Sequence, residues 1–145
     1  MIKTEASENS ERASCVFCNI IKKEIPAEII FENENTIAFL EIKPSAPGHT
    51  MVIPKKHGES ILDFEEKELG LIMASVKKVS EKISLALSPD SLTIGINHME
   101  KRGVPHLHIH IIPRWENDKG GIMQTIVHNP PTETLEQICE RIRGQ

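Results

Sequence analysis

The stretch 106–113 constrains the fold of this chain more than any other, because it reads HLHIHIIP. Three histidines alternate with aliphatic residues, and a period of two predicts a β-strand. Successive side chains of a strand point to opposite faces of its sheet. We therefore expect one face to carry a row of imidazoles, while Leu107, Ile109 and Ile111 enter a hydrophobic core on the other.

Spacing along that strand separates the roles of the three histidines. A rise of about 3.3 Å per residue puts His106 and His110 roughly 13 Å apart. Zinc–nitrogen bonds are only about 2.0–2.1 Å long, so one ion can bind neighbouring rings but not both ends of the row. A solvent-facing strand that carries histidines by chance is the alternative. Three ionisable rings in one row favour a functional site.

Length and charge limit the class of protein. A chain of 145 residues fits one domain, which we expect to span 15–145 after a disordered leader over 1–14. The formal charge of −4 leaves no basic surface for long nucleic acids, so a nucleotide partner should be small. No stretch approaches the ~20 apolar residues of a membrane span, and the polar start lacks the apolar centre of a secretion signal. These features predict a cytoplasmic protein without a membrane partner.

The cysteines indicate metal or redox chemistry. There are three, an odd number, and two of them form the motif Cys15-Val16-Phe17-Cys18. In a reducing compartment this spacing favours a metal or redox site over a disulfide framework. Redox chemistry would be expected beside a βαβ unit, which the pattern of this chain does not suggest. We interpret Cys139 as an ordinary apolar residue of a helix.

Apolar periodicity and turn residues predict an α+β domain. Five β-rich runs with tight connections favour an antiparallel meander, with helices to one side. Asp63 and Glu66 are spaced as a capping box, and the apolar residues that follow recur at helical spacing, which predicts a long helix covering one sheet face. The expected strands are 28–32, 36–42, 49–53, 92–97 and 106–112. The expected helices are a short one from Cys15, a long one over 64–87 and a short one over 132–142.

The histidine row and two further motifs carry a resemblance to a known family. The row matches the His-x-His-x-His-x-x motif of the histidine triad family, in which x is apolar. Residues 48–57, GHTMVIPKKH, resemble the second signature of that family, and the Cys15–Cys18 pair extends the likeness. The similarity runs from about Cys15 to Arg114. It implies the fold of that family, with a five-stranded antiparallel sheet, a long helix and a short N-terminal helix.

The resemblance implies that His108 is a nucleophile. A neutral imidazole has a free lone pair near pH 7, and its attack on phosphorus yields a reactive phosphoramidate. In histidine triad enzymes the matching residue attacks the α-phosphorus of a nucleotide and leaves a nucleotidyl-histidine for water to hydrolyse. His110 would then bind phosphate oxygens or protonate the leaving group. His49 would support the orientation of the row, and a buried histidine with a satisfied hydrogen bond is the alternative.

The resemblance also implies a nucleotide pocket beside the row. Part of the hairpin over 28–42 would wall the base and the ribose, through Phe31, Phe39, Glu41 and Ile42. Without the resemblance, the apolar members of this set would be core residues. Asn97 matches a phosphate-contacting asparagine of the family, whereas an ordinary strand-end asparagine is the alternative.

Two departures from the family pattern concern substrate choice. Many members have an aspartate for the ribose hydroxyls where this chain has Glu41, whose extra methylene shifts the contact or routes it through water. Most members carry a Gly-Gln-Ser/Thr-Val segment before the triad, whereas residues 100–105 read EKRGVP in a shorter loop. Lys101 or Arg102 then either replaces a neutral hydrogen bond with a charge or faces solvent.

Zinc is the cofactor that the resemblance implies. Cys15 and Cys18 provide two soft ligands, and tetrahedral zinc needs four. The family pattern points to His57 and His106 as the other two. A structural Zn²⁺ site of this kind would tie the N-terminal helix to the sheet, and no catalytic metal is required.

These observations predict an enzyme that acts at the α-phosphate of small purine nucleotides, either nucleoside phosphoramidates or dinucleoside polyphosphates. The chain resembles the smaller, general branch of the family, which favours phosphoramidates and implies a homodimer. A tri-histidine metallohydrolase is one alternative, disfavoured by the spacing of the row. A zinc-stabilised nucleotide-binding regulator is another, in which the altered loop over 100–105 has lost turnover.

Overall fold

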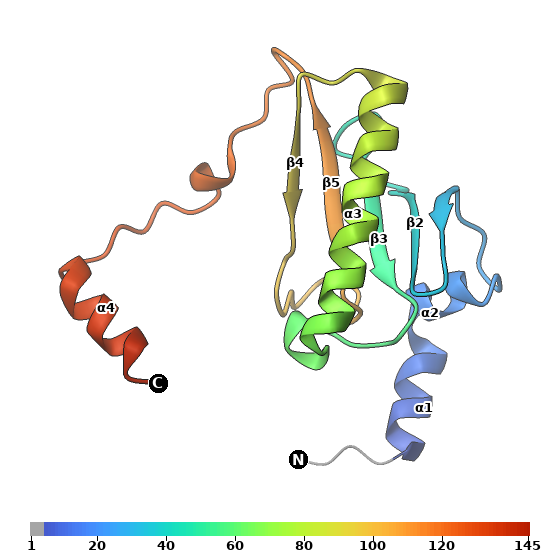
Figure 1. Cartoon of the computed structure of the whole chain (residues 1–145), viewed down its shortest axis with the longest axis horizontal. Coiled ribbons are helices and arrows are strands. Elements are labelled where there is room, and N and C mark those ends of the chain that lie inside the picture. The colour runs from blue at the N-terminus through green and yellow to red at the C-terminus, as the bar shows by residue number, and fades with distance from the viewer. Residues whose placement is uncertain (1–4) are drawn as a thin grey trace.

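The chain is built around a five-stranded antiparallel sheet, as a computed structural model that describes residues 5–145 shows (Figure 1). The strand order is β1-β2-β3-β5-β4, and each neighbouring pair is antiparallel. The strands are β1 (Ile29–Glu32), β2 (Thr36–Leu40), β3 (Thr50–Pro54), β4 (Ser91–Gly95) and β5 (Ile109–Arg114). The predicted α+β fold class is confirmed.

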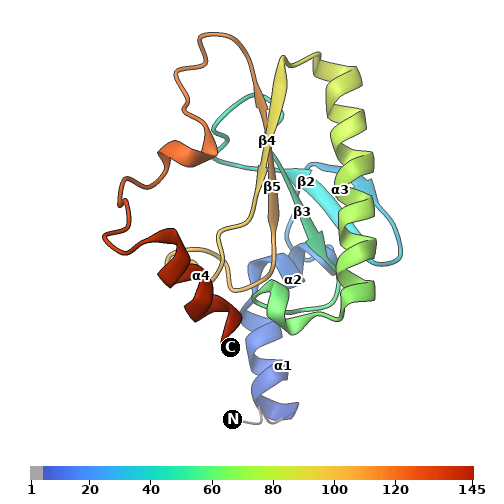
Figure 2. The same cartoon turned by 60° about the vertical axis from the view of Figure 1, so that its left-hand side comes forward.

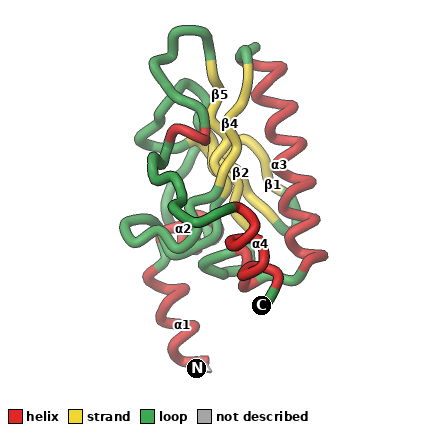
Figure 3. The backbone as a smooth tube through the Cα atoms, turned by 90° about the vertical axis from the view of Figure 1, so that its left-hand side faces the viewer, coloured by secondary structure: helices red, strands yellow, loops and turns green. Residues whose placement is uncertain are grey.

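Helices lie on both sides of this sheet, whereas the sequence predicted helices on one side only. The α-helices are α1 (Glu5–Ser14), α2 (Val16–Ile21), α3 (Glu66–Leu87) and α4 (Leu135–Arg143), and the 3-10 turns are η1 (Ile61–Asp63) and η2 (Met123–Thr125). Figure 3 shows α3 and α2 on opposite sides of the strands. In Figures 1 and 2, α4 follows a long connection and stands away from the sheet. Within 5–145, no helix combines the length and the apolar character needed to cross a membrane.

The two sheet faces have separate hydrophobic cores. On one face, Ile72, Val76, Val79 and Ile83 of α3 recur at three- and four-residue spacing and are buried against aliphatic residues of the strands. On the other face, a smaller core contains α2 and alternate residues of β2 and β3. Its buried members are Cys15, Phe17, Cys18, Ile20, Ile37, Phe39, Met51 and Ile53. The α2 side is therefore the face on which the histidine row is expected.

Strand β5 begins and ends later than predicted. It runs from Ile109 to Arg114 rather than over 106–112. The backbone N–H of Leu107 donates to the carbonyl of Gly58 at 2.6 Å, so this part of the chain is bonded to a loop and not to a strand. Pro113 continues the strand because it lies past the last β3 partner, where only the β4 side is paired. A proline is tolerated in such an edge-like position.

The N-terminal segment differs from the prediction. Residues 1–14 were expected to be disordered, whereas Glu5–Ser14 forms α1, and residues 1–4 lie outside the described part of the chain. The prediction used apolar periodicity, which a helix with a polar surface does not show. Good helix formers such as Ala6 and Arg12 favour a helix without that signal, and Arg12 lies in the last turn, where a cation complements the helix dipole.

The long helix starts two residues later than predicted and with a different cap. Asp63 caps the 3-10 turn η1 instead, because its Oδ2 accepts from the backbone N–H of Ser60 at 2.8 Å. At α3, the Glu68 carboxylate accepts from the backbone N–H of Glu65 at 2.9 Å. The predicted spacing of three residues between the two capping residues was thus correct, but the residues that form the caps are Ser60 with Asp63 and Glu65 with Glu68.

Candidate active site and metal centre

The histidine row lies on the α2 face of the sheet, opposite the aliphatic residues that alternate with it. His110 pairs with Met51 of β3 on one side and with Gly95 of β4 on the other. Phe17 of α2 stands over the row, with its ring centroid 5.4 Å from that of His108 in an edge-on contact. Leu107, meanwhile, is buried in the core under α3. Alternation along the chain therefore separates the polar row from the hydrophobic core.

His108 is held in one tautomer by the backbone. Its Nδ1–H donates to the carbonyl of His106 at 2.7 Å, because a carbonyl can only accept. Nε2 then carries the free lone pair. Only 8% of the residue is exposed, so packing constrains the orientation of the ring. This is the arrangement that a nucleophilic imidazole needs.

His49 and His110 form a chain of hydrogen bonds beside this lone pair. The backbone N–H of Ser45 donates to Nδ1 of His49 at 3.1 Å, so the proton of neutral His49 is on Nε2. That Nε2–H donates to Nδ1 of His110 at 2.8 Å. Neutral His110 must then carry its own proton on Nε2. The row thus presents an acceptor on His108 and a donor on His110.

Burial favours the neutral form of both His49 and His110. It lowers the pKa of His49, and the charge of Glu41 opposes that shift. Burial also lowers the pKa of His110, together with the nearby His108 and His49, while Glu41 and Glu100 oppose the shift. Desolvation therefore outweighs the carboxylates at both rings.

A cavity of about 250 Å³ adjoins His108 and contains the predicted phosphate ligand Asn97 among its lining residues. Asn97 lies two residues past the end of β4, in the loop that leads to the row. Glu100 and Lys101 line the same cavity, whereas Arg102 does not. Of the two cations in the altered loop, Lys101 is the one that lines the cavity together with His108.

The hairpin residues assigned to the nucleotide pocket divide between the two faces. Phe39 lies on the α2 face, 5.5 Å from Phe17 between ring centroids. Phe31 does not, because a bulge between Ile29 and Phe31 pairs it with Ala38 and turns it toward the core under α3. The structure therefore separates Phe31 from the histidine row, contrary to the prediction.

The other two hairpin positions, Glu41 and Ile42, directly follow the end of β2. Glu41 bonds through its backbone N–H to the carbonyl of His49 at 2.9 Å, and its carboxylate accepts from the backbone N–H of Lys43. Ile42 is 86% exposed, so its apolar side chain is available to a ligand rather than buried in the core. Glu41 is close enough to the His49–His110 pair for its charge to act on both rings.

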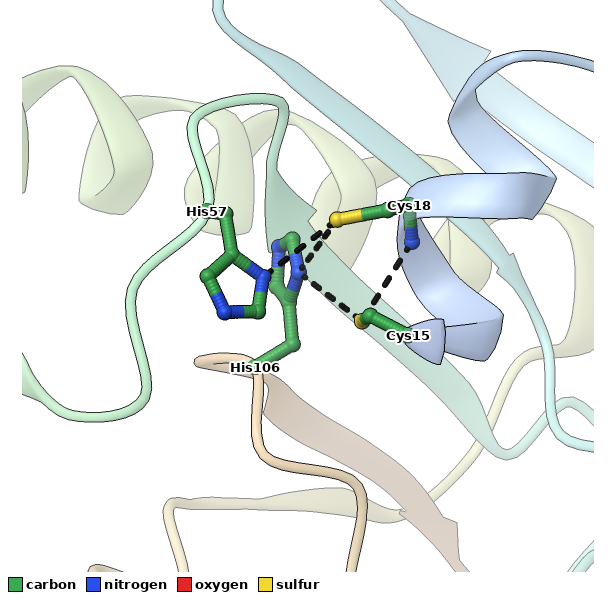
Figure 4. A group of neighbouring side chains, drawn as sticks. All are labelled: Cys15, Cys18, His57 and His106. Atoms are coloured by element: carbon green, nitrogen blue, oxygen red, sulfur yellow. Dashed lines mark hydrogen bonds between the residues drawn. The ribbon is translucent and has the colours of Figure 1, made fainter. Parts of the chain in front are cut away.

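Four side chains converge at the N-terminus of α2, in the group drawn in Figure 4. They are Cys15, Cys18, His57 and His106, and their ligand atoms all lie within 4.8 Å of one another. Nδ1 of His106 is 3.6 Å from both sulfurs, and Nδ1 of His57 is 3.3 Å from Sγ of Cys18. The four come from three distant parts of the sequence, which the fold brings together.

This group fits a tetrahedral ion of the zinc type. Bonds of about 2.3 Å to sulfur and 2.0–2.1 Å to nitrogen imply ligand–ligand distances of about 3.3–3.8 Å, which the measured nitrogen–sulfur distances match. His106 donates its Nε2–H to the carbonyl of Pro54 at 2.8 Å, which leaves the Nδ1 lone pair facing the sulfurs. Burial and the neighbouring Cys15 raise the pKa of the Cys18 thiol to about 11. A bound cation would supply the charge that the thiolate form requires.

Comparison with known proteins agrees with this geometry. The model of the HIT domain family matches residues 22–117, about two thirds of the chain. The chain belongs to the HIT domain family. Among its relatives in this family, the adenosine 5'-monophosphoramidase HNT1 of Candida albicans is 34% identical over 117 residues, which cover 77% of this chain and 77% of that protein.

Solved structures of HIT proteins share the fold. A HIT family protein of Bacillus subtilis has 34% identity and a TM-score of 0.79, covering 91% of this chain and 96% of that one. A zinc-bound histidine triad protein of Mycobacterium smegmatis has 32% identity and a TM-score of 0.70, covering 83% of this chain and 86% of that one. The HIT family thus includes a named phosphoramidase and a zinc-bound member.

Two residues of the site escaped the sequence analysis. Phe17 was read only as a helix residue, although it contacts His106 and His108 edge-on. Its place inside the cysteine motif was the available signal. Ser45 acts through its backbone N–H on His49, and no side-chain pattern reports such a contact.

Proposed function

We propose that this HIT protein cleaves small purine nucleotides at the α-phosphorus through a nucleotidyl intermediate on His108. The observation that carries the proposal is the hydrogen bond from Nδ1 of His108 to the carbonyl of His106, which leaves Nε2 as a nucleophile of fixed orientation. The donor on His110 lies beside it, with ring centroids 5.0 Å apart.

The chemistry requires two displacements at phosphorus. Nε2 of His108 forms a bond to the α-phosphorus as the bond from phosphorus to the leaving group breaks. His110 gives its Nε2 proton to the leaving atom, so a phosphoramidate releases a neutral amine, and the backbone carbonyl of His106 stabilises the positive charge that develops on His108. Water then attacks the phosphorus, breaks the bond to His108 and returns a proton to His110, which releases the nucleoside monophosphate and restores both imidazoles. His49 keeps His110 in the donating tautomer.

The preferred substrates are nucleoside phosphoramidates. A phosphoramidase among the relatives of the chain supports this choice, and so does the neutral row, which offers a lone pair and a donor without a catalytic metal. Phe39, Glu41, Ile42 and Asn97 are the residues proposed to contact the nucleotide. Phe31 is left out because it packs under α3.

The proposal also includes a structural zinc ion and a cytoplasmic location. A structural Zn²⁺ on Cys15, Cys18, His57 and His106 would join α2 to the loop before the row, and the zinc-bound relative supports that metal. Thiols that bind metal must stay reduced, which favours a cytoplasmic protein. Within residues 5–145, His108 and His110 belong to no group of three converging ligand atoms, which argues against a tri-histidine metal centre on the row.

We also propose that the protein forms a homodimer through β4 and α3. β4 is an edge strand, and Ile94 in it is 38% exposed. Leu71 and Met73 of α3 are exposed as well. Pairing two β4 edges would extend the sheet and remove an unpaired edge from solvent.

Rapid quenching tests the nucleophile. Adenosine 5'-phosphoramidate labelled at phosphorus is mixed with enzyme and quenched in base, and the protein is then assayed for label that acid releases, as a phosphorus–nitrogen bond requires. We expect the wild type to trap label and His108→Ala to trap none, with a loss of several orders of magnitude in turnover. His128→Ala, an exposed histidine outside the site, serves as the matched control and should behave as the wild type.

Other results of these experiments would favour a different nucleophile, a nucleotide-binding regulator or a metallohydrolase. Label on His108→Ala, or turnover near the original rate, would place the attacking atom elsewhere. Tight nucleotide binding without label or product in the wild type would favour a regulator. A chelator that abolishes turnover while the melting temperature stays constant would favour a metallohydrolase.

A further inference from the structure

The N-terminal helix α1 is bonded to the start of α2, next to the four proposed zinc ligands. The backbone N–H of Cys15 donates to the carbonyl of Arg12 at 3.3 Å, and Nδ2 of Asn19 donates to the carbonyl of Ala13 at 3.4 Å. Cys15 is both the N-cap of α2 and a member of the metal group. The end of α1 is therefore fixed to a proposed metal ligand through its backbone.

A cavity of about 460 Å³ adjoins both α1 and the metal group. Asn9 and Arg12 of α1 line it together with two of the proposed ligands, Cys18 and His57. The helix thus forms one wall of a space that reaches the metal group. Its polar side chains have a structural environment there, although the sequence predicted a disordered leader over these residues.

A carboxylate of α1 lies in a second cluster of polar groups around His57. The carboxylates of Glu11 and Glu59 and the ring of His57 each place one ligand-type atom within 4.8 Å of the others. Figure 4 shows Nδ1 of His57 directed at Cys18, 3.3 Å from its sulfur, and the second ring nitrogen pointing away from both cysteines. Nε2 is therefore the nitrogen of His57 that is left for a carboxylate.

A carboxylate beside a metal-binding imidazole strengthens that ligand. When the ring N–H donates to a carboxylate, the bond fixes the tautomer and the orientation of the ring and raises the basicity of the other nitrogen. A divalent ion on Nδ1 in turn attracts the two carboxylates, whose mutual repulsion disfavours their approach to a neutral ring. The cluster therefore fits a metal-bound His57 better than a metal-free one.

The two carboxylates of the cluster are held in different ways. Glu59 belongs to the loop of His57, and its backbone N–H donates to the carboxylate of Asp63 at 2.9 Å. It also lines the 250 Å³ cavity that adjoins His108. Glu11, in contrast, is half-buried and comes from a separate helix. Its place beside His57 therefore depends on the folding of α1 against α2.

We propose that Glu11 is a positioning residue for the zinc ligand His57, accepting the Nε2–H of that ring and holding Nδ1 toward the metal. This inference rests on the proposed zinc site, because it assigns the group that orients one of its ligands. The folding of α1 onto α2 then completes the surroundings of the metal. Retention of zinc depends on a helix that supplies no ligand itself.

The test measures the zinc affinity of the full chain by competition with a colorimetric chelator. Glu11→Gln removes the charge and keeps the size and the helix propensity of the side chain. We expect it to lower the affinity by about 10–100-fold, the range found when a group that orients a metal ligand is changed. Glu24→Gln, which removes an exposed carboxylate outside both clusters, is the matched control and should keep the wild-type affinity.

A spectroscopic measurement separates positioning from a general loss of stability. Cobalt(II) bound in place of zinc absorbs visible light, and its bands depend on the geometry of the ligands. The bands should shift in Glu11→Gln, because His57 would no longer be held in one orientation. They should stay in place in Glu24→Gln.

Failure of the zinc site and failure of the role of Glu11 give different results. A wild type that binds no zinc would overturn the zinc site, and this inference with it. Zinc bound by the wild type, with unchanged affinity in Glu11→Gln, would overturn the role of Glu11 alone. A lower affinity with unchanged cobalt bands would also overturn it, since Glu11 would then act only through the stability of α1.

Discussion

His49 controls the proton on His110, although it lies one strand away from the row. Its Nε2–H donates to Nδ1 of His110, and this bond leaves the proton of neutral His110 on Nε2. We expect His49→Gln to lower kcat by about 10–100-fold, the range found when a residue that orients a functional histidine is removed. The dissociation constant for AMP should stay within about twofold, because the nucleotide contacts remain.

Calorimetric binding and steady-state kinetics check this prediction on the same preparations. His98→Gln, an exposed histidine in the loop before the row, is the matched control and should retain wild-type values. An equal loss of nucleotide affinity and kcat in His49→Gln would show that His49 binds the ligand directly.

Acid should destabilise the fold through the buried histidines. Burial lowers the pKa of His49 and of His110, so the unfolded chain binds protons more readily than the folded one. The stability from keeping these rings neutral is therefore complete above pH ~6.5 and is lost as the pH falls below it. Denaturant midpoints at pH 7.5, 6.0 and 5.0 should decline in the wild type and decline less in His110→Asn. An equal decline of the midpoints in the wild type and in His110→Asn would show that protonation of His110 does not cause the loss of stability.

At the scale of elements, the turn before β3 depends on a glycine. Gly48 has φ +79°, a left-handed conformation, and a methyl group placed on it would lie 3.3 Å from Cγ of Pro113, with Leu87 at the end of α3 closer still. We expect Gly48→Ala to lower the free energy of unfolding by about 1–3 kcal/mol, the usual cost of a side chain in this region. Chemical denaturation measures the change.

Gly70 in α3 provides the opposite control. Apart from its chain neighbours and the backbone of its own helix, nothing lies within 4 Å of a methyl group placed there. Gly70→Ala should raise the free energy of unfolding by up to about 1 kcal/mol, because alanine is the better helix former. Destabilisation by both substitutions would mean that loss of glycine flexibility, rather than the left-handed turn, explains Gly48→Ala.

At the scale of the whole molecule, the group of four proposed zinc ligands joins three distant parts of the chain. α2 reaches the loop before the row through Cys15, Cys18, His57 and His106. Purified protein never exposed to chelator should carry about one zinc ion per chain. Cys15→Ala combined with Cys18→Ala should lower the melting temperature more than it lowers the turnover of the folded fraction.

Elemental analysis and thermal melts test the metal together. Cys139→Ala, which changes a cysteine outside the group, should keep both the zinc content and the melting temperature. Purified protein that contains no metal would contradict the proposed zinc site. A loss of turnover at constant stability would instead assign the metal to the reaction.

The dimer is tested at the same scale. Sedimentation at micromolar protein should give twice the monomer mass of 16.3 kDa. Ile94→Lys on β4 should shift the mass toward the monomer, since a charge on an edge strand opposes edge pairing. Ile142→Lys on α4, which is also exposed but lies away from β4 and α3 in Figure 1, should not. A monomer mass for the wild type would remove the dimer.

The sequence by itself determined the family, the fold class and the polar face of the sheet. Alternation from His106 to Ile111 requires opposite faces for histidines and aliphatic residues, because the side-chain period of a strand is two. The helical spacing of the apolar residues in α3 likewise required a buried stripe. These signals are local, so they are present before any tertiary contact forms.

Tertiary structure decided the features that depend on distant partners. A bulge in β1 turned Phe31 away from the row, and such an inserted residue has no signature in the alternation. The tautomer of His108 depends on a backbone carbonyl, and that of His110 on Ser45 through His49. Met123 packs over β4 at Gly95, where a methyl group would lie 3.3 Å from its Cε. Backbone geometry and long-range packing set these contacts, and residue types along the chain do not encode them one by one.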